Sequence, residues 1–559
     1  MKKTSLISIL MSAALITTVT GCGAKEASPA ASETTVTENA SAATEAVSEA
    51  VSTEESSKAE KSAETDRTSL PRTVITTDGE VDDMNSVIRA LLYSNEMDIA
   101  GIVLTSSMYH YAGDEDKGIE PFRWTGTDWI YEYLDSYEEV LPNLKKHDPN
   151  YPDADSLRKI TKIGNISNKG EMEEVTEGSE FLKDLFLDDD ERTLYVQTWG
   201  GTNTTARALK SIEEEYSETD QWEEIQKKIY DKLVLYIILD QDESYSDYIA
   251  KSWPELTIIN DRSNFWHFAY AWQLHDDSVN TALHADWNEK NLLNKGALMD
   301  HYALMGDGNL IEGELDEEQR GSDEYLKNNP DYVKYDFISE GDSPSFLYLV
   351  NNGLRSLENP SYGGWGGRFG LAEDSDNRWI NNVLDYDKNV GDFEAIYTLT
   401  RWFDDIQNDF AARADWCVAE NYEDANHAPS VTVKEGLDIT AKAGETVTLT
   451  AEVSDPDGDS VSVNWWRYAE ADSYQDEKRE VNEMKEDDSL GMLLNITREP
   501  IEDEEINSIV IEGSSSETAS FKVPEDAKSG DTIHIICEAE DDGAHHLKHY
   551  ARVIVTVEK

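Results

Sequence analysis

Three aspartates with spacing suited to a cation site occur near the start of the folded part of the chain. Asp78, Asp82 and Asp83 fall within six residues, in the stretch TTDGEVDDMNSV, between an apolar run and a helical pattern. Carboxylates grouped in this way can hold a hard divalent cation such as calcium. A strand ending before them and a helix starting among them would bring all three to one end of the strand.

The same residues have a simpler interpretation as the first turn of a helix. Asp82 is a good N-cap, and acidic residues in a first turn stabilise a helix by about 0.3–1 kcal/mol each. Acidic residues number 115 of 559, so a fixed pattern of three arises by chance about five times in such a chain. The spacing alone leaves both interpretations open.

The charge of the whole chain excludes some partners. Lys and Arg together number 48 against 115 acidic residues, which gives a formal net charge of −67. Such a field repels nucleic acid and anionic lipid head groups and favours neutral or cationic partners. We therefore expect no nucleic-acid partner, and multivalent cations are the obvious small ligands.

The N-terminus has the features of an export signal. In residues 1–22 two lysines precede an apolar stretch, and Cys22 ends the sequence VTGC, which resembles a bacterial lipobox. A plain secretory signal with an incidental cysteine is the alternative. The lipobox implies lipidation of Cys22 and a protein anchored to the membrane at the bacterial cell surface. Residues 23–70, rich in Ala, Ser, Thr and Glu, predict a disordered tether.

Residues 71–425 predict an α/β domain. Apolar runs alternate with helical patterns, which indicates a doubly wound, mostly parallel sheet covered on both faces. Helices are expected to begin near Asp82 and Asn203. The expected strands are 74–75, 99–104, 194–197 and 233–239. Ligands bind beyond the carboxyl ends of strands in such folds. The polar or aromatic residues at those ends are Asp78, Ser106, Trp199 and Asp240.

Residues 426–559 have the pattern of a small Ig-like β-sandwich. Short alternating strands are separated by turn signals such as DPDGD at 455–459. The clearest strands are 431–433, 446–450, 461–463 and 551–557. We expect Cys417 and Cys537 to be buried free thiols, although an oxidising exterior would permit a disulfide.

Five separated stretches, in order, resemble a known family. The opening segment, VITTDGEVDDMNSVIRALLYSNEMDIAGIVLT, is similar to the start of nucleoside hydrolases. It resembles more closely the bacterial exported cellulose-binding family with a nucleoside-hydrolase-like domain and a C-terminal β-sandwich domain. The other matching stretches are WGGTNTTARAL at 199–209, GDSPSFLYLVNNGL at 341–354, GGWGGRFG at 363–370 and QNDFAARADW at 407–416.

The resemblance implies a calcium site and its ligands. Asp78, Asp83, Asp342 and the backbone carbonyl of Trp199 would hold Ca2+, and Asp82 would hold sugar hydroxyls. Asp78 would be catalytic, taking a proton from the water that attacks the anomeric carbon. Several oxygen ligands around a hard cation suit calcium, and a carboxylate that accepts a proton suits glycoside hydrolysis.

Two departures from the hydrolase pattern put nucleoside cleavage in question. The first aspartate of the usual D-x-D-x-x-x-D-D motif is Thr76 here, and the histidine before the late aspartate is Gly341. That histidine commonly helps the leaving base depart. His110, His267 and His275 are possible substitutes, and each has a structural role as its alternative interpretation.

Aromatic residues suggest a binding surface for sugars. Trp365 is the best candidate because two glycine pairs flank it, which suits a tight loop close to a ligand, and Arg368 could add hydrogen bonds to sugar hydroxyls. A structural turn with Trp365 packed inward is the alternative. The other candidates for stacking on sugar rings are Trp124, Trp199, Trp465 and Trp466.

Three functions remain open from the sequence. The first is a surface-anchored, calcium-dependent hydrolase of glycosidic bonds, with N-glycosidic bonds of nucleosides among them. The second is a non-catalytic lipoprotein that binds cellulose or another glycan through a nucleoside-hydrolase-like fold. The third, a solute-capturing partner of a transporter, fits the large enzyme-like domain less well. The expected ligand in the first two cases is a sugar, a nucleoside or a polysaccharide.

Overall fold

The computed structural model describes residues 67–275, 277–476 and 507–559. The predicted lipidation site Cys22 and nearly all of the predicted tether lie outside these residues. No helix among the described residues has both the length and the apolar character needed to cross a membrane.

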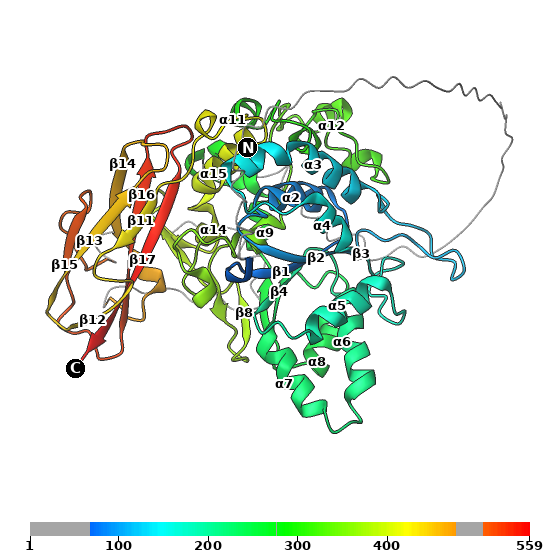
Figure 1. The fold of residues 1–559 in the computed structure, drawn as a ribbon, viewed down its shortest axis with the longest axis horizontal. Coiled ribbons are helices and arrows are strands. Elements are labelled where there is room, and N and C mark those ends of the chain that lie inside the picture. Colours follow the sequence, from blue (N-terminus) through cyan, green and yellow to red (C-terminus); the bar gives the residue numbers. More distant parts are fainter. Residues whose placement is uncertain (1–66, 276, 477–506) are drawn as a thin grey trace, which may run out of the picture. The chain divides into compact units, whose positions relative to one another are not determined.

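A central sheet of eight strands organises the first part of the chain. The strand order is β3-β2-β1-β4-β5-β6-β8-β7, and every neighbouring pair is parallel except β7 with β8. The strands are β1 (Arg72–Thr77), β2 (Asp98–Leu104), β3 (Thr161–Ile163), β4 (Leu194–Thr198), β5 (Leu233–Ile238), β6 (Thr257–Asp261), β7 (Gly370–Leu371) and β8 (Arg378–Ile380). Figure 1 shows them in the middle of the domain.

Helices cover both faces of this sheet, as the apolar runs predicted. Figure 1 shows α2, α3 and α15 on one side and α5, α6 and α7 on the other. The longer helices are α2 (Val81–Leu92), α3 (Trp129–His147), α5 (Glu177–Leu187), α6 (Asn203–Tyr216), α7 (Trp222–Lys232) and α15 (Phe403–Trp416). The shorter ones are α4 (Ala154–Lys159), α8 (Ala250–Ser252), α9 (Asn264–His267), α10 (Asp277–Asn280), α11 (Ala285–Asn291), α12 (Asp323–Asn328), α13 (Ser343–Leu347) and α14 (Tyr397–Thr400).

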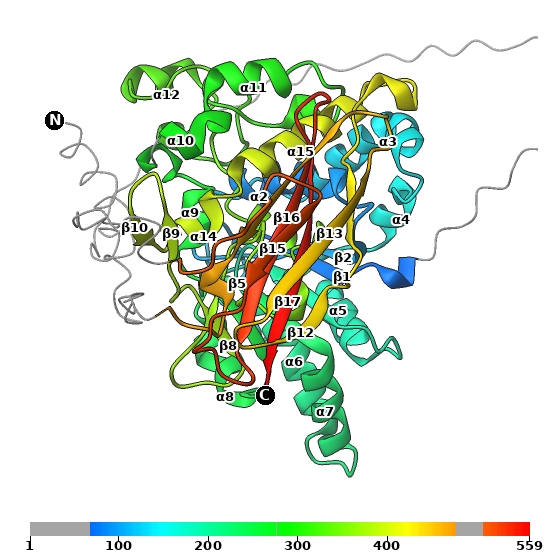
Figure 2. The same cartoon turned by 90° about the vertical axis from the view of Figure 1, so that its left-hand side faces the viewer.

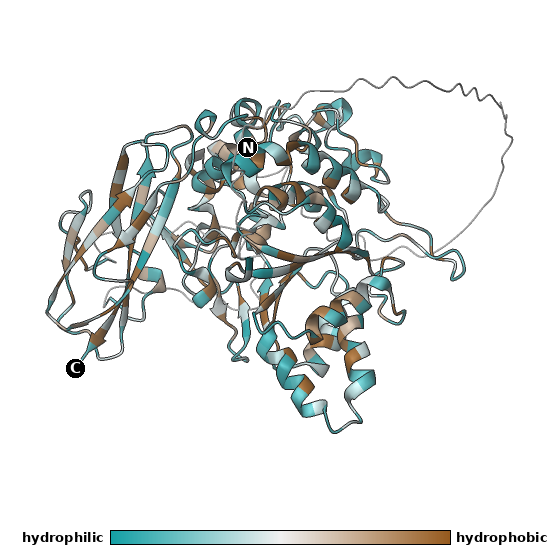
Figure 3. Cartoon of the chain, in the orientation of Figure 1, coloured by the Kyte–Doolittle hydropathy of each residue, from teal (hydrophilic) through white to brown (hydrophobic). Residues whose placement is uncertain are grey.

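Alternate residues of the strands pack into two separate apolar cores. On β1, Val74 packs with Leu209 of α6, whereas its neighbour Ile75 packs in the core that contains Ile88 of α2. Side chains on a strand point alternately to its two faces, so neighbouring apolar residues on a buried strand pack into different cores. Figure 3 shows apolar residues concentrated on the central strands and on the adjoining helices. The predicted doubly wound, mostly parallel α/β fold is confirmed.

The second part of the chain is a β-sandwich. One sheet has the order β11-β13-β15 and the other β12-β17-β16-β14, and Figure 2 shows their strands. A separate apolar core lies between them. The strands are β11 (Ser430–Val433), β12 (Asp438–Lys442), β13 (Thr446–Ser454), β14 (Val461–Arg467), β15 (Thr518–Lys522), β16 (Thr532–Asp541) and β17 (Lys548–Glu558). Cys417 and Cys537 are both buried and unpaired, as expected.

Buried polar contacts join the sandwich to the α/β part. The Tyr468 hydroxyl donates to Asp385 Oδ2 at 2.6 Å, and Arg552 Nε donates to the carbonyl of Leu354 at 2.7 Å. Asp385 begins a short hairpin of the α/β part, formed by β9 (Asp385–Asp387) and β10 (Asp392–Glu394). A buried donor or acceptor that loses its partner costs free energy. These bonds therefore favour one fixed arrangement of the segments they join.

Candidate active site

The turn between β1 and α2 carries the first group of acidic residues. Helix α2 begins at Val81 with Glu80 as its N-cap, so Asp82 and Asp83 lie in the first turn and Asp82 is not the cap. Asp83 Oδ1 accepts hydrogen bonds from the Thr77 hydroxyl at 2.6 Å and from the Asp78 backbone N–H at 3.2 Å. These bonds fix Asp83 beside Asp78 at the carboxyl end of the strand.

Glycines allow Asp78 to occupy this position. Gly79 has φ +79°, a conformation that side chains other than glycine rarely adopt. A Cβ at Gly200, just after β4, would lie 2.9 Å from Asp78 Cγ. The register of β1 with β4 pairs Thr76 with Thr198, which explains why the two strand ends meet at Asp78.

Asp342 joins this group from a distant part of the chain. It is buried immediately before α13, and its side chain makes no capping hydrogen bond to that helix. One oxygen each of Asp82, Asp83 and Asp342 lie within 4.8 Å of one another. Asp82, which was predicted to hold sugar hydroxyls, is therefore part of this trio together with the predicted ligands Asp83 and Asp342.

Repulsion among buried carboxylates defines the electrostatics of the site. Burial, together with the charges of Glu80 and Asp78, raises the pKa of Asp82 to about 7. Burial and the neighbouring carboxylates also raise the pKa values of Asp83 and Asp342 well above the usual range. Such a cluster either holds protons or binds a cation.

Two oxygens of the cluster are available for a ligand. Asp78 Oδ2 and Asp342 Oδ2 are buried and have no hydrogen-bond partner among the described residues. Buried carboxylate oxygens are normally satisfied, because an unpaired one costs free energy. Calcium binds hard oxygen ligands such as carboxylates, so these residues are chemically suited to hold it.

The backbone carbonyl of Trp199, which was predicted to be a calcium ligand, already accepts a hydrogen bond. Its N–H donates to the Thr76 carbonyl at 3.0 Å, and its indole Nε1 donates to Ser345 Oγ at 2.8 Å. The carbonyl oxygen accepts from Gln241 Nε2 at 2.5 Å. A carbonyl has two lone pairs, so one remains for a cation. The buried indole cannot stack on a sugar.

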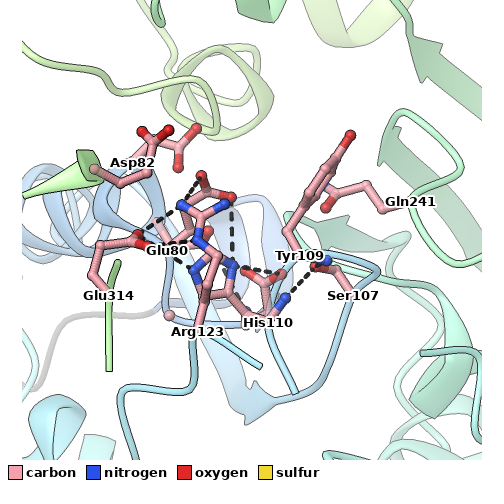
Figure 4. Close-up of polar contacts among 12 residues, drawn as sticks. Glu80, Asp82, Ser107, Tyr109, His110, Arg123, Gln241 and Glu314 are labelled. Carbon is pink, nitrogen blue, oxygen red and sulfur yellow. Dashed lines mark hydrogen bonds and ion pairs between the residues drawn. The ribbon is translucent and has the colours of Figure 1, made fainter. Parts of the chain in front are cut away.

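His110, one of the three histidines considered as substitutes, lies at the acidic cluster. Figure 4 shows it between Glu80 and Glu314. Its Nδ1 is 3.6 Å from Glu80 Oε2 and 4.0 Å from Asp78 Oδ2. Burial lowers the pKa of His110, but the negative charges of Glu80, Glu314 and Asp78 outweigh burial and raise it overall. Ser107 Oγ accepts from the His110 N–H at 3.2 Å and so helps to hold this turn.

Charged residues from loops complete the surroundings. Arg123 forms two hydrogen bonds to Glu314, at 2.6 and 2.7 Å, and lies 3.5 Å from Glu80 (Figure 4). The Tyr270 hydroxyl donates to Glu80 at 3.2 Å and to Asp82 at 3.4 Å. These residues could not be predicted from the sequence because they lie in loops, which have no periodicity. Glu80 alone had a local signal, since it lies within the acidic stretch.

The two departures from the hydrolase pattern have structural explanations. A Cβ at Gly341 would lie 2.9 Å from Asp82 Oδ2 and 3.3 Å from Phe265, so a histidine there would displace the Asp82 carboxylate. Thr76 is buried in β1, and its hydroxyl donates to the Gln197 carbonyl at 3.3 Å. The local packing is therefore adapted to both replacements.

The predicted sugar-binding residues Trp365 and Arg368 have structural contacts instead. Trp365 is buried in the apolar core, and Arg368 forms a buried ion pair with Asp385 at 2.7 Å. A Cβ at Gly366 would lie 2.6 Å from the Pro344 carbonyl, so this glycine serves close packing against α13. Trp365 therefore packs inward, as the structural interpretation of this loop predicted. These contacts give no support to sugar binding by either residue.

His267 and His275 form a buried pair with each other. Their ring centroids lie 4.9 Å apart, and burial lowers the pKa of His275 to about 4. The contacts of this pair fit the structural interpretation.

Comparisons with known proteins agree on the family. Residues 72–369 match the family described as "Cellulose-binding Sde182, nucleoside hydrolase-like domain", and residues 446–557 match "Cellulose-binding protein Sde0182, C-terminal domain". A solved structure of a nucleoside hydrolase-related hypothetical protein from Saccharophagus degradans, described as associated with carbohydrate metabolism, is similar to this chain. It is 27% identical, with a TM-score of 0.62, and the match covers 88% of this chain and 100% of that one.

More distant structures add little. The inosine-guanosine nucleoside hydrolase is 10% identical with a TM-score of 0.27, and its match covers 56% of this chain and 93% of that chain, which is too weak to carry an argument. No curated protein sequence matches. The family match spans more than half of the chain, so the protein belongs to the cellulose-binding Sde182 family with a nucleoside-hydrolase-like domain.

Proposed function

We propose that this protein is a calcium-dependent hydrolase of glycosidic bonds, including N-glycosidic bonds of the nucleoside type. The observation that carries the proposal is the convergence of Asp82, Asp83 and Asp342, together with the unpartnered oxygens of Asp78 and Asp342. These residues come from segments more than 250 positions apart, and their mutual repulsion in a buried place costs stability. A bound cation explains why such an arrangement persists.

The residues divide into metal ligands and substrate contacts. Asp78, Asp83, Asp342 and the Trp199 carbonyl would hold calcium, which, when bound, polarises water and orients a sugar diol. The close approach of Asp82 to the other carboxylates also makes it a candidate ligand. Asp78 Oδ2 would accept the proton of the attacking water, and Asp82 would accept hydrogen bonds from sugar hydroxyls.

His110 would replace the missing histidine at position 341. Its Nδ1 has no hydrogen-bond partner among the described residues, and the carboxylates around it favour the protonated ring. A proton held there could pass to the leaving group as the glycosidic bond breaks. The oxygen of water would then bond to the anomeric carbon, and its proton would stay on Asp78. One proton is thus taken up by Asp78 for each proton that His110 gives to the leaving group.

A second function is non-catalytic binding of a glycan. Gln241 already occupies one lone pair of the Trp199 carbonyl, and Gly341 has no side chain to assist a leaving group. The matching family is also described as cellulose-binding. In this case the same carboxylates and cation would capture sugar hydroxyls without bond cleavage.

We also propose that the protein is exported and that a lipid on Cys22 anchors it to the membrane. Changing Cys22→Ala should prevent incorporation of radioactive palmitate. Palmitate retained by that variant would refute the lipidation proposal.

One experiment separates hydrolysis from capture. Purified protein, with calcium or with chelator, is incubated with nucleosides, p-nitrophenyl glycosides and cello-oligosaccharides, and both binding and product are measured. Calcium-dependent product supports the hydrolase. Calcium-dependent binding without product supports capture, and neither result with any ligand would refute both functions.

A further inference from the structure

A cavity of about 610 Å³ lies where the α/β part meets the sandwich. It is lined by residues of α14, the start of α15 and strand β14, including Tyr397, Asp404, Asn464 and Trp466. It shares no residue with the cluster around Asp78. Its volume falls within the range of about 300–1,000 Å³ that is typical of small-molecule sites.

Aromatic rings form part of the cavity wall. Trp466 and Tyr397 line the cavity and are only partly buried. Trp466 is one of the two tryptophans of the WW pair. Its neighbour Trp465 also borders the cavity, but it is buried in the sandwich core. Aromatic side chains that combine a large apolar face with partial exposure are suited to ligand contact.

Arg401 holds the aromatic wall in place. Its guanidinium lies 5.1 Å from the Tyr397 ring centroid and 4.8 Å from the Trp466 ring centroid. It also forms an ion pair with Asp385 at 3.1 Å. This ion pair fixes the cation, and the cation in turn stacks on both rings, so the wall is ordered before any ligand arrives.

The charges in the cavity are largely balanced. Lys548 forms ion pairs with Asp405 at 3.0 Å and with Glu538 at 3.1 Å, and all three line the cavity. Exposed polar groups, Asn464 and Lys388 among them, complete the lining. A strongly charged ligand would meet groups of both signs, and a purely apolar ligand would leave the polar groups unsatisfied.

We propose that this cavity binds a neutral oligosaccharide, with a sugar ring against Trp466 and Tyr397. Sugar rings present apolar C–H faces and hydroxyl edges, which match partly exposed aromatic rings bordered by amide and charged groups. The site needs no cation and does not depend on the hydrolase proposal. It would hold a polysaccharide chain independently of any chemistry at Asp78.

The test is calorimetric titration of the full protein with cellohexaose and mannohexaose, with oligogalacturonate as the charged probe. In chelator, at least one neutral hexasaccharide should still bind wild-type protein, and more tightly than oligogalacturonate. Trp466→Ala should weaken that binding at least tenfold. Because this change also removes contacts to Trp402 and Tyr468, a second variant is needed.

The second variant is Asn464→Arg. The exposed Asn464 lines the cavity, and a larger side chain there would obstruct the sugar. Ser462→Arg is the matched control: Ser462 is exposed on the same face of β14 but does not line the cavity. Loss of binding in chelator in Asn464→Arg but not in Ser462→Arg supports the proposal. It is overturned if neither hexasaccharide binds, if Asn464→Arg binds like wild type, or if binding requires calcium and Asp342.

Discussion

Arg89 of α2 and Glu340 form a completely buried ion pair, with Arg89 Nη2 2.7 Å from Glu340 Oε1. Arg89 follows Asp82 and Asp83 on the same helix, and Glu340 is two residues before Asp342. The pair therefore connects the two segments that supply the acidic cluster. Tyr302 and Ser343 also donate hydrogen bonds to Glu340, so its carboxylate is well satisfied.

The first prediction concerns this ion pair. Arg89→Met leaves Glu340 buried without its cation, and should lower the free energy of unfolding by about 3–5 kcal/mol. Adding Glu340→Gln removes the unpaired charge and should recover part of the stability, as measured by urea denaturation. Calcium affinity of the double variant should stay at least tenfold weaker, because Asp342 is less firmly placed. Normal calcium affinity in the double variant would show that the pair is only structural.

The second prediction is that the carboxylates share one calcium ion. Calcium should raise the melting temperature of the wild-type protein, since a ligand bound only by the native state stabilises it. Asp83→Asn and Asp342→Asn should each abolish this rise in differential scanning calorimetry. Asp242→Asn is the control, because Asp242 is a buried carboxylate whose oxygens bond Ser244 and Asn203. Calcium responses that are equal in all four proteins would contradict a metal site.

The third prediction is a pH dependence of the chelated protein. The pKa of Asp82 is raised from 3.8 to about 7 in the native state, so between these values the native state binds more protons than the unfolded state. This contribution to stability is fully present below pH 3.8 and is lost as pH rises through about 7. Calcium needs ionised ligands, so its stabilising effect should grow over the same interval.

Asp82→Asn isolates this effect from the other titrating groups. In chelator, the stability of the variant relative to wild type should increase from pH 4 to pH 8. One pKa unit corresponds to about 1.4 kcal/mol, so the increase should reach at most about 4 kcal/mol. Urea denaturation at several pH values measures it. A constant difference between the two proteins would mean that Asp82 titrates normally.

Much of the fold could be predicted because its signals are local. The apolar runs predicted β1, β2, β4 and β5, and all four form adjacent parallel strands. Strand β3 has only three residues, and β8 likewise, so neither has a detectable period. Strand β6 was not predicted either. It has five residues and ends in the buried Asp261.

The candidate site could be predicted only in part. Asp78, Asp82 and Asp83 share one turn, so their grouping was visible in the sequence, whereas Asp342 was identified through family resemblance alone. His110 and Glu314 approach each other to 3.7 Å across two loops, and no sequence period encodes such a contact. Trp365 and Arg368 are both buried, and Gly366 beside Trp365 allows close packing against Pro344, a role that the sequence does not distinguish from ligand access.

The fourth prediction tests Asp78 as the proton acceptor. Asp78→Asn keeps the size of the side chain and one oxygen, so the fold and most of the sugar affinity should remain. Turnover should fall by about 10²–10⁴-fold, the usual contribution of a general base. Initial rates and calorimetric binding of the same substrate measure the two effects separately. Turnover within a few-fold of wild type would remove Asp78 from the mechanism.

The fifth prediction concerns the proton for the leaving group. If His110 supplies it, His110→Gln should slow cleavage of inosine or uridine, whose bases need protonation, by about 10²-fold or more. Cleavage of p-nitrophenyl riboside should change little, since p-nitrophenolate leaves without a proton. His267→Gln is the matched control, a buried histidine whose ring contacts His275.

The ratio of the two rates carries the test. Loss of both activities in equal measure would mean that His110 only supports the acidic cluster, where its Nδ1 lies 4.0 Å from Asp78 Oδ2. Wild-type protein that cleaves p-nitrophenyl riboside but not nucleosides would mean that His110 does not replace the histidine missing at Gly341. If the wild type cleaves neither substrate and still binds sugars in a calcium-dependent manner, Asp78, Asp82 and Asp83 serve capture on a fold that has lost its hydrolytic activity.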